Sequence, residues 1–192
     1  MKNRFKKLLS EYINNSIDSI SKLDYSCSSS IIEAAELIIS SLKKNNKLLI
    51  CGNGGSAADS QHIAAELVGR YMRNRKPLAS IALSTDTSVI TAISNDLSFN
   101  EIFSRQIESI GNEGDILYAI STSSKSKNIL AALKMAKSLN IKSIGVTGID
   151  NSGFMDLCDV SIKVPATRPD RIQEMHIAIG QIICEILETE LC

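Results

Sequence analysis

The stretch CGNGGSAADSQHIAAELVGR, residues 51–70, joins a predicted strand to a predicted helix. It begins at the end of the short apolar run KLLIC (47–51), and a segment with a helical pattern follows its glycines. Glycine in a turn between a strand and a helix lets the backbone come close to a ligand, and the free N–H groups at a helix N-terminus favour negative charge. The stretch therefore predicts a strand–turn–helix unit that binds a small anion.

Two nucleotide-binding motifs contain a glycine-rich turn of this kind. Gly52 to Ala57 match the loose dinucleotide pattern G-x-G-x-x-G/A. However, the next predicted strand ends in Ser84 and Thr85, with no acidic residue to bind a ribose. A P-loop is excluded, because no Gly-Lys-Ser/Thr follows the glycines. A structural turn that binds nothing stays open as the alternative.

Short apolar runs alternate with helical patterns between residues 47 and 165. Apolar strands that alternate with helices are typical of a parallel sheet covered on both faces. We therefore predict an α/β fold, a three-layer sandwich with a five-stranded parallel sheet, in a single domain over residues 1–192. The predicted strands are 47–51, 79–83, 115–121, 142–148 and 160–165, and the predicted helices between them are 57–75, 89–110 in two pieces and 127–140.

Further helices are predicted on both sides of this core. Residues 1–46 predict two helices, with Ser28-Ser29-Ser30 able to cap the second, and residues 168–190 predict a long C-terminal helix. Their apolar stripes are longer than a five-stranded sheet is expected to cover. We therefore expect these N- and C-terminal helices to mediate oligomerisation.

Composition and charge narrow the class of protein. The chain has 21 Lys and Arg residues and 21 Asp and Glu residues, so no net field attracts it to nucleic acid or to an anionic membrane. No apolar run approaches the roughly 18–20 residues that span a bilayer. Five scattered cysteines without a CxxC pair disfavour disulfides and a thiolate zinc site, and they favour a reducing compartment. A cytoplasmic location is the expectation.

A second loop, AISTSSKSKN at residues 119–128, is rich in hydroxyl groups. It runs from a predicted strand into a predicted helix, so helix-terminal N–H groups and hydroxyls together can bind the oxygens of a phosphate monoester. A serine-rich helix cap is the alternative. Both loops are expected at the carboxyl edge of the sheet, where ligands of such folds bind. A phosphorylated small molecule is therefore the predicted ligand.

His62 and Glu66 stand four residues apart, which places them on one face of the predicted helix. The segment PDRIQEMHIAIGQ, residues 169–181, brings a second polar group to the start of the C-terminal helix. Its members are Asp170, Gln173, Glu174, His176 and Gln181. Either group can be acid–base or metal-binding, and either can be a satisfied part of the core. Spacing alone leaves both interpretations open.

Several separate motifs resemble those of the phosphoheptose isomerases, in the sugar isomerase (SIS) domain superfamily. They are CGNGGSAADSQHIAAELVGRY, SND, FSRQIE, GNEGD, ISTS and RIQEMHI, and the resemblance runs from about residue 30 to the C-terminus. It implies the SIS fold and a homotetramer with active sites between subunits. It also implies interconversion of sedoheptulose 7-phosphate and D-glycero-D-manno-heptose 7-phosphate, an aldose–ketose isomerisation that leads to bacterial surface heptose, as in lipopolysaccharide.

The resemblance also assigns roles to residues. It implies a site with Glu66 and Asp170 among its catalytic residues, and one zinc ion per subunit. Glu66 is our candidate acid–base group, because a buried carboxylate can remove and return a proton through an enediolate. The implied zinc ligands are His62, Glu66, Gln173 and the position of Gln181. The implied substrate-binding residues are Asn53, Gly54, Gly55, Ser56, Arg70, Asn95, Asp96, Ser121, Thr122, Ser123, Ser126 and Gln173.

The chain departs from the family at two positions. Gln181 stands where the isomerases carry a histidine that binds zinc and is proposed as the second acid–base group. Glutamine cannot transfer a proton at neutral pH and is a poor zinc ligand. Ser124 replaces the glycine of the family's STSG motif. We therefore expect weaker zinc binding, and slower or differently arranged catalysis.

Two classes of non-enzyme are the alternatives. The DnaA initiator-associating protein, a tetrameric SIS-domain partner of DnaA, resembles the chain around LSTDTSVITAISND and RIQEMH, and it also lacks the histidine at the position of Gln181. It lacks the carboxylate at the position of Glu66 as well, so Glu66 together with His62 favours the enzyme. An SIS module that senses a sugar phosphate is the third class, although nothing in the sequence suggests an attached DNA-binding domain.

Overall fold

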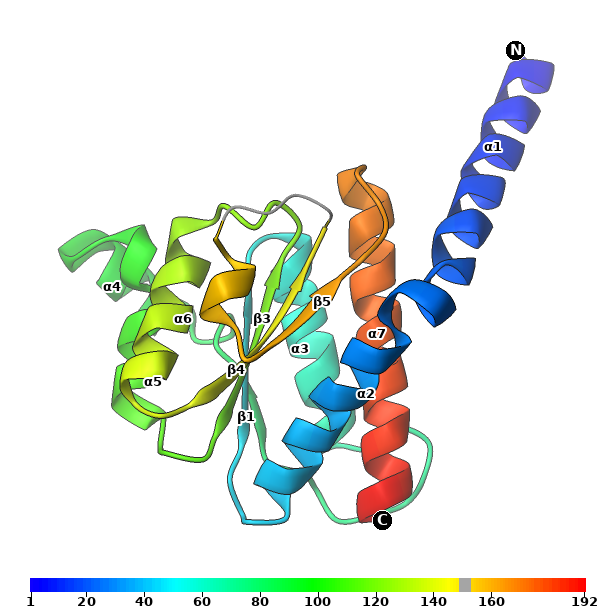
Figure 1. Ribbon diagram of the computed structural model, residues 1–192. Helices are drawn as coiled ribbons and strands as arrows, with labels where there is room; N and C mark the ends of the chain where they lie inside the picture. Colours follow the sequence, from blue (N-terminus) through cyan, green and yellow to red (C-terminus); the bar gives the residue numbers. More distant parts are fainter. Residues whose placement is uncertain (149–152) are drawn as a thin grey trace.

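The computed structural model describes residues 1–148 and 153–192. Five parallel strands form one sheet in the order β2-β1-β3-β4-β5 (Figure 1). The strands are β1 (Leu48–Gly52), β2 (Ser80–Ala82), β3 (Ile116–Ser121), β4 (Lys142–Thr147) and β5 (Val160–Lys163). Each coincides with one of the apolar runs, so the prediction of a five-stranded parallel sheet is confirmed.

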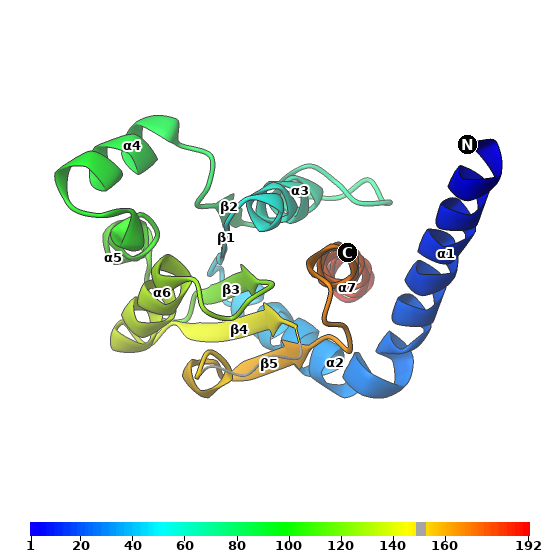
Figure 2. The ribbon, with the colours of Figure 1, turned by 90° about the horizontal axis from the view of Figure 1, so that it is seen from above.

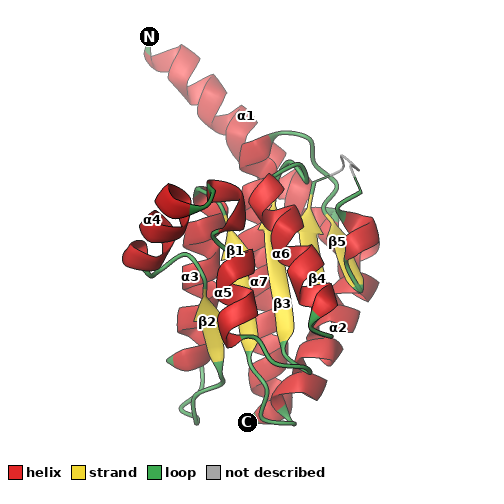
Figure 3. Ribbon diagram, turned by 90° about the vertical axis from the view of Figure 1, so that its left-hand side faces the viewer, coloured by secondary structure: helices red, strands yellow, loops and turns green. Residues whose placement is uncertain are grey.

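Helices cover both faces of the sheet (Figure 3). One face carries α2 (Leu23–Leu42), α3 (Gly55–Val68) and α7 (Pro169–Leu191), and the other carries α5 (Ser104–Ile110) and α6 (Lys127–Ser138). Successive residues of a strand point to opposite faces. Accordingly, Leu49 and Leu117 belong to the core under α5 and α6, whereas Ile50 and Tyr118 belong to the core under α2, α3 and α7. The predicted three-layer sandwich is confirmed.

The strand order creates a crevice at the carboxyl edge of the sheet. From β1 the chain crosses to β2 on one side, and from β3 it crosses to β4 on the other side, so the connections diverge between β1 and β3. Ligands of open parallel sheets bind at such a switch point. The two predicted anion-binding loops follow Gly52 and Ser121, the last residues of these two strands. The topology therefore brings both loops to the crevice.

The first two helices differ from the prediction in where they meet. α1 (Lys2–Ser21) and α2 are separated at Lys22, and Ser28-Ser29-Ser30 lie inside α2 rather than before it. The Ser30 hydroxyl donates to the carbonyl of Cys27, one helical turn earlier, so it does not cap a helix. Cys27 and Ile31 are both buried against the sheet, and this packing carries the helix through the serines. The predicted serine cap is wrong.

The helix predicted over residues 57–75 is also too long at its C-terminal end. α3 ends at Val68, and residues 69–76, which we call the strap, leave it as an irregular segment. The piece predicted over 89–110 divides, as expected, into α4 (Thr87–Asp96) and α5, with the short 3-10 helix η1 (Phe99–Glu101) between them. A second 3-10 helix, η2 (Met155–Leu157), precedes β5. The predicted C-terminal helix is α7.

Two helices, α1 and α4, stand out from the three layers (Figure 2). α4 has no buried residue, and Ser19 is the buried residue of α1. The exposed apolar side chains of α1 are Phe5, Leu8, Leu9, Ile13, Ile17 and Ile20. Within the described residues, none of the helices combines the length and the apolar character needed to cross a bilayer. The N-terminal apolar stripe is thus left uncovered by the chain itself.

Candidate active site

The glycine-rich turn after β1 adopts a backbone conformation and a close contact with α7 that favour glycine. Gly54 has a φ of 55°, in the left-handed region that side chains disfavour. A Cβ atom on Gly55 would lie 2.9 Å from Oε1 of Gln173, so glycine is needed for the close approach of α7. The Ser56 hydroxyl then donates to the same Gln173 oxygen at 3.2 Å. The turn and the start of α7 therefore form one wall of the site.

A pair of amides joins the two loops. Asn53 and Asn128 donate to each other's side-chain oxygens, and both distances are 2.8 Å. Asn53 follows β1, whereas Asn128 is in the first turn of α6 and is 2% exposed. Asn128 was not among the predicted site residues. The pair holds the turn after β1 and the serine-rich loop after β3 at a fixed separation.

The serine-rich loop keeps part of its hydrogen-bonding capacity for a ligand. Ser126 is the N-cap of α6, yet its side chain makes no capping hydrogen bond. The Ser121 hydroxyl is buried and has no partner among the described residues. Thr122 and Ser123 line a pocket of about 360 Å³ that the start of α7 closes on its other side. Hydroxyls without protein partners beside a helix N-terminus are suited to bind a phosphate.

Ser124, the residue that departs from the family motif, adopts a strained backbone conformation. Its φ is 54°, in the region where glycine is favoured, and the residue is fully buried. Its hydroxyl donates to the carbonyl of Ser123 at 2.7 Å. The loop thus keeps a glycine-like backbone with a serine in place.

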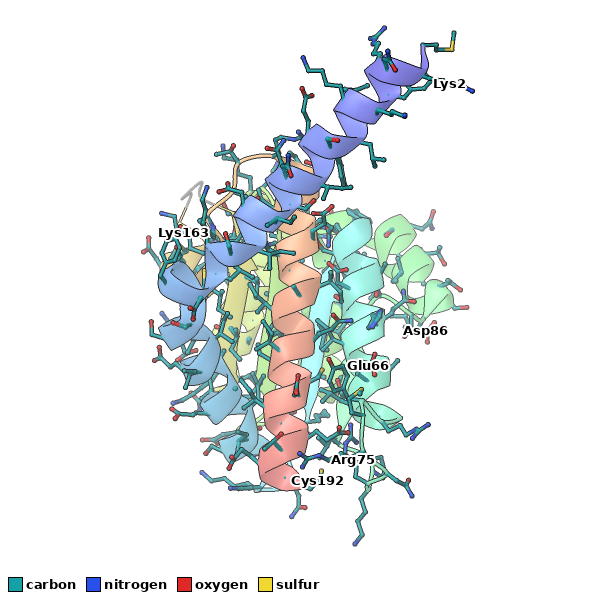
Figure 4. All side chains as sticks on the ribbon, turned by 90° about the vertical axis from the view of Figure 1, so that its right-hand side faces the viewer. Lys2, Glu66, Arg75, Asp86, Lys163 and Cys192 are labelled. Carbon is teal, nitrogen blue, oxygen red and sulfur yellow. The ribbon has the colours of Figure 1, made fainter. Side chains whose placement is uncertain are left out.

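His62 and Glu66 lie side by side on α3, as their spacing predicts. His62 Nε2 and Glu66 Oε1 are 3.1 Å apart, with side chains 48% and 24% exposed. Figure 4 shows Glu66 on the side of α3 that lies next to α7. At this exposure the carboxylate is partly shielded from water and still accessible to a ligand.

Asp59, one turn before His62 on α3, is a site residue that the sequence analysis missed. It is 9% exposed, and Nε2 of Gln173 donates to its Oδ2. Burial raises the pKa of Asp59 to about 6, against an opposing effect of His62. Its partner lies 114 residues away in the sequence, so spacing could not reveal the pair. A polar residue on the buried face of a predicted helix was the available signal.

The start of α7 contributes an ionised carboxylate. Asp170 accepts hydrogen bonds from Arg168 at 3.1 and 2.7 Å and from Arg171 at 3.3 Å. The Arg168 guanidinium above all, and Arg171 with it, holds the pKa of Asp170 below its usual value, although burial acts in the opposite direction. Asp170 is consequently charged at neutral pH and can orient a hydroxyl, but it has no proton to donate there.

His176 is not available to replace the missing histidine. It is 1% exposed inside the fold, and burial lowers its pKa to about 4, against an opposing effect of the Thr147 backbone. Gln181 lies farther along α7 at intermediate exposure, two helical turns beyond Gln173. The position of the usual histidine is therefore occupied by an amide.

Three predicted substrate-binding residues stand apart from the rest. Arg70 is exposed on the strap after α3. Asn95 and Asp96 are the last residues of α4, where Asn95 donates to Asp96 at 2.7 Å. α4 projects from the sheet on the side away from α7 (Figure 2). The structure of one chain thus brings together the two loops, α3 and α7, but it does not bring Asn95 and Asp96 to them.

The donor atoms around Glu66 test the implied zinc site. The 3.1 Å between His62 and Glu66 is close to the about 3.3 Å that separates two ligands of one tetrahedral zinc ion. The other two implied ligands, Gln173 and Gln181, would add amide oxygens, which zinc seldom uses. Among the described residues, no group of three or more His, Cys, Asp or Glu is placed to hold a metal. The donor set fits weak zinc binding, with two good ligands.

Comparisons with known proteins agree with this geometry. Residues 11–148 match the SIS domain. A phosphoheptose isomerase of Campylobacter jejuni is 54% identical over 158 residues, which cover 82% of this chain and 85% of that protein. One of Helicobacter hepaticus is 48% identical over 183 residues, covering 95% and 93%.

The solved structure of phosphoheptose isomerase from Neisseria gonorrhoeae is 38% identical and superposes with a TM-score of 0.91. The superposition covers 96% of this chain and 99% of that one. These matches cover between 82% and 99% of the chains compared, so the family predicted from the motifs is confirmed. The chain belongs to the phosphoheptose isomerases of the SIS domain family.

Proposed function

We propose that the chain is an aldose–ketose isomerase that interconverts sedoheptulose 7-phosphate and D-glycero-D-manno-heptose 7-phosphate, towards bacterial surface heptose. The observation that carries the proposal is the partly shielded His62–Glu66 pair on the helix whose N-terminal turn faces the switch point. The names of the relatives support the same reaction.

The serine-rich loop holds the phosphate in this proposal. Ser121, Thr122, Ser123 and Ser126 supply hydroxyls, and the first turn of α6 supplies backbone N–H groups. The phosphate is remote from the reacting carbons, so the energy of binding it positions those carbons for the proton transfer. The sugar chain then extends from β3 past the glycine-rich turn towards α3.

Glu66 carries the proton in the reaction. Its carboxylate takes the proton from C1 of the ketose, and the electron pair of that C–H bond forms a C1–C2 double bond while the C2 oxygen gains the charge. The same proton then returns to C2, the hydroxyl on C1 loses its proton as the new carbonyl forms, and the C2 oxygen takes up that second proton to become the C2 hydroxyl. A carboxylate can serve as base and then as acid when its surroundings favour both states.

The His62 ring is placed to orient the Glu66 carboxylate, and Gln173 is fixed by Asp59 and Ser56. His62 and Glu66, with the amide oxygens of Gln173 and Gln181, would hold a weakly bound zinc ion. Zinc would supply a positive charge for the oxygens of the enediolate. The variant Gln181→His should raise zinc affinity in calorimetric titration and raise kcat; a decrease of both would contradict this ligand set.

Assembly of several copies, expected as a homotetramer in the cytoplasm, is part of the proposal. The uncovered apolar stripe of α1 and the projecting α4 support it. A neighbouring copy would also account for Asn95 and Asp96, which the single chain leaves away from α7. The binding-protein alternative, with DnaA as partner, is not favoured, because relatives more than half identical to the chain are named phosphoheptose isomerases.

The test is an isomerase assay with sedoheptulose 7-phosphate. The wild-type chain should form the aldose phosphate, and Glu66→Gln should lower kcat by about 10²- to 10⁴-fold, as expected for loss of an acid–base group. Glu36→Gln, an exposed carboxylate on α2, is the matched control and should leave kcat unchanged. No conversion by the wild-type chain would contradict the function, and full activity of Glu66→Gln would contradict the role of Glu66.

A further inference from the structure

The end of α7 holds the strap with a buried carboxylate. Glu188 is 2% exposed, and it lies near the C-terminus of the chain, far along α7 from Gln173. Its oxygens accept the backbone amides of Tyr71, Met72 and Arg73 at 3.2, 2.8 and 2.8 Å. They also accept Nε of Arg75 at 2.9 Å. One side chain of α7 thus fixes the course of most of the strap.

Arg75 also binds α3, and so connects Glu188 to that helix. Its Nη2 donates to the carbonyl of Glu66 at 2.7 Å, and its Nη1 donates to the carbonyl of Leu67 at 2.8 Å. The last carbonyls of an α-helix have no partner within the helix, so they need one from outside. Arg75 supplies it for Glu66, and for Leu67 it does so together with the Leu78 amide, which donates to the Leu67 carbonyl at 3.0 Å. Figure 4 shows Arg75 below Glu66, near the end of the chain.

Arg75 and Glu188 form a charged pair that is almost completely buried. The Arg75 and Glu188 side chains are both 3% exposed. Burial alone would raise the pKa of Glu188, but the amides of Met72 and Arg73, the Arg75 guanidinium and the amide of Tyr71 together lower it. The carboxylate is therefore ionised at neutral pH, which suits an anchor for several N–H donors.

We propose that Glu188 and Arg75 are positioning residues of the isomerase site, which hold the Glu66 turn of α3 and the Arg70 strap in their working geometry. The inference rests on the proposed function, in which Glu66 moves the proton, and on the substrate contact that the family resemblance implies for Arg70. Neither Glu188 nor Arg75 was among the predicted site residues. Arg75 acts on the reacting step through the Glu66 backbone, and Glu188 acts on both the reacting step and the strap.

Two variants separate these effects. Arg75→Lys keeps the charge but cannot reach the two carbonyls and the carboxylate together, so kcat should fall by about ten- to a hundredfold, the loss expected for a displaced catalytic group. Its KM should stay within about twofold of wild type, because Glu188 still holds the strap amides. Glu188→Gln should lower kcat similarly and raise KM as well, because it also releases Arg70.

Hydrogen exchange of the backbone amides supplies a readout that does not depend on activity. Exchange at Met72 and Arg73 should become faster in Glu188→Gln and stay slow in Arg75→Lys. Asp115→Asn is the matched control, since Asp115 is a buried carboxylate that binds two amides and Lys47 at the opposite edge of the sheet. It should lose stability and keep the wild-type kcat and KM, measured well below its unfolding temperature.

Three outcomes would overturn the inference. Unchanged strap exchange in Glu188→Gln would show that Glu188 does not hold the strap. Wild-type kcat in both variants would show that the Glu66 turn needs no support from Arg75. An equal loss of kcat in Asp115→Asn would show a general effect of stability. A wild-type chain without isomerase activity would instead overturn the proposed function, which none of the variant results can imitate.

Discussion

At the amino edge of the sheet, the buried carboxylate of Asp115 is fully satisfied, whereas near the carboxyl edge two buried polar groups, those of Asp59 and Ser121, are not. Asp115 is 1% exposed and accepts the amides of Lys47 and Asn112 and the ammonium group of Lys47, at 2.9, 2.8 and 2.6 Å. Asp59 is also buried, but its partner among the described residues is the neutral amide of Gln173. The Ser121 hydroxyl has no partner there.

The difference distinguishes a carboxylate that stabilises the fold from polar groups that are available to a substrate. Buried polar groups without partners cost free energy, and they are expected where a ligand will supply the missing contacts. Asp115 therefore serves the structure of the sheet, and Asp59 and Ser121 keep hydrogen-bonding capacity that a substrate can use. The substitutions below test this contrast in order of decreasing predicted effect.

Asp115→Asn should have the largest effect on stability. It removes the charge that pairs with Lys47 and leaves a donor facing backbone N–H groups, so the free energy of unfolding should fall by about 3–5 kcal/mol. Chemical denaturation of the purified chain measures the loss. A change below about 1 kcal/mol, the range of exposed ion pairs, would show that the amino edge does not depend on this carboxylate.

Asp59→Asn should have the opposite effect, because it should raise the free energy of unfolding at high pH. Because the pKa of Asp59 is raised from 3.8 to about 6, the wild-type fold binds this proton more tightly than the unfolded chain does. This stabilising contribution is complete below pH 4 and is lost as the pH rises through 6. The variant should therefore match wild type at low pH and exceed its stability by about 2–3 kcal/mol at pH 8.

Urea denaturation of both proteins between pH 4 and pH 8 measures this difference. A variant that is less stable than wild type at pH 8 would contradict the account, because it would show that the charged form of Asp59 is satisfied in the fold. Asp115 would then no longer differ from Asp59.

Ser121→Ala should change binding rather than stability. The hydroxyl has no partner within residues 1–148 and 153–192, so the unfolding free energy should stay unchanged or rise slightly. KM for the sugar phosphate should rise about tenfold, the effect of losing one hydrogen bond to a charged ligand. Ser143→Ala is the control, because the Ser143 hydroxyl donates to Leu157 at 3.2 Å near the start of β4. It should cost stability and leave KM unchanged.

Ser124→Gly should have the smallest effect. The left-handed conformation at Ser124 is unfavourable for serine, and glycine removes that strain. Greater freedom of the unfolded chain offsets part of the gain, so the net stabilisation should be below about 1 kcal/mol. Asn140→Gly, at a similar φ of 57°, should gain less because asparagine tolerates this region. Thermal unfolding that ranks the two in reverse would contradict the account.

The fold could be predicted from the sequence because its signals are local. Each strand is a short apolar run, and the alternation with helices indicates a parallel sheet. The errors come from contacts between distant segments. α3 ends at Val68, and Glu188, more than a hundred residues away, holds the strap that follows. The helix over Ser28-Ser29-Ser30 continues because Cys27 and Ile31 pack on the sheet.

The candidate site was predictable where spacing or motif reports it. His62 and Glu66 are one helical turn apart, which predicts that they share a face. The hydroxyl groups of the serine-rich loop predict an anion-binding site. Asp59 and Asn128 were missed because their partners, Gln173 and Asn53, are 114 and 75 residues away. Only the folded chain shows that these residues fix Gln173 and Asn53, two residues of the candidate site.

We infer that the serine-rich loop at the carboxyl edge binds the phosphate, so that C1 and C2 of the sugar lie against residue 66. A crystal structure of Glu66→Gln with sedoheptulose 7-phosphate tests it most directly. We expect the phosphate within hydrogen-bond distance of Ser121 and Ser126, and C1 or C2 next to the residue 66 side chain. A phosphate bound elsewhere, or a residue 66 side chain that faces away from the sugar, would contradict the account.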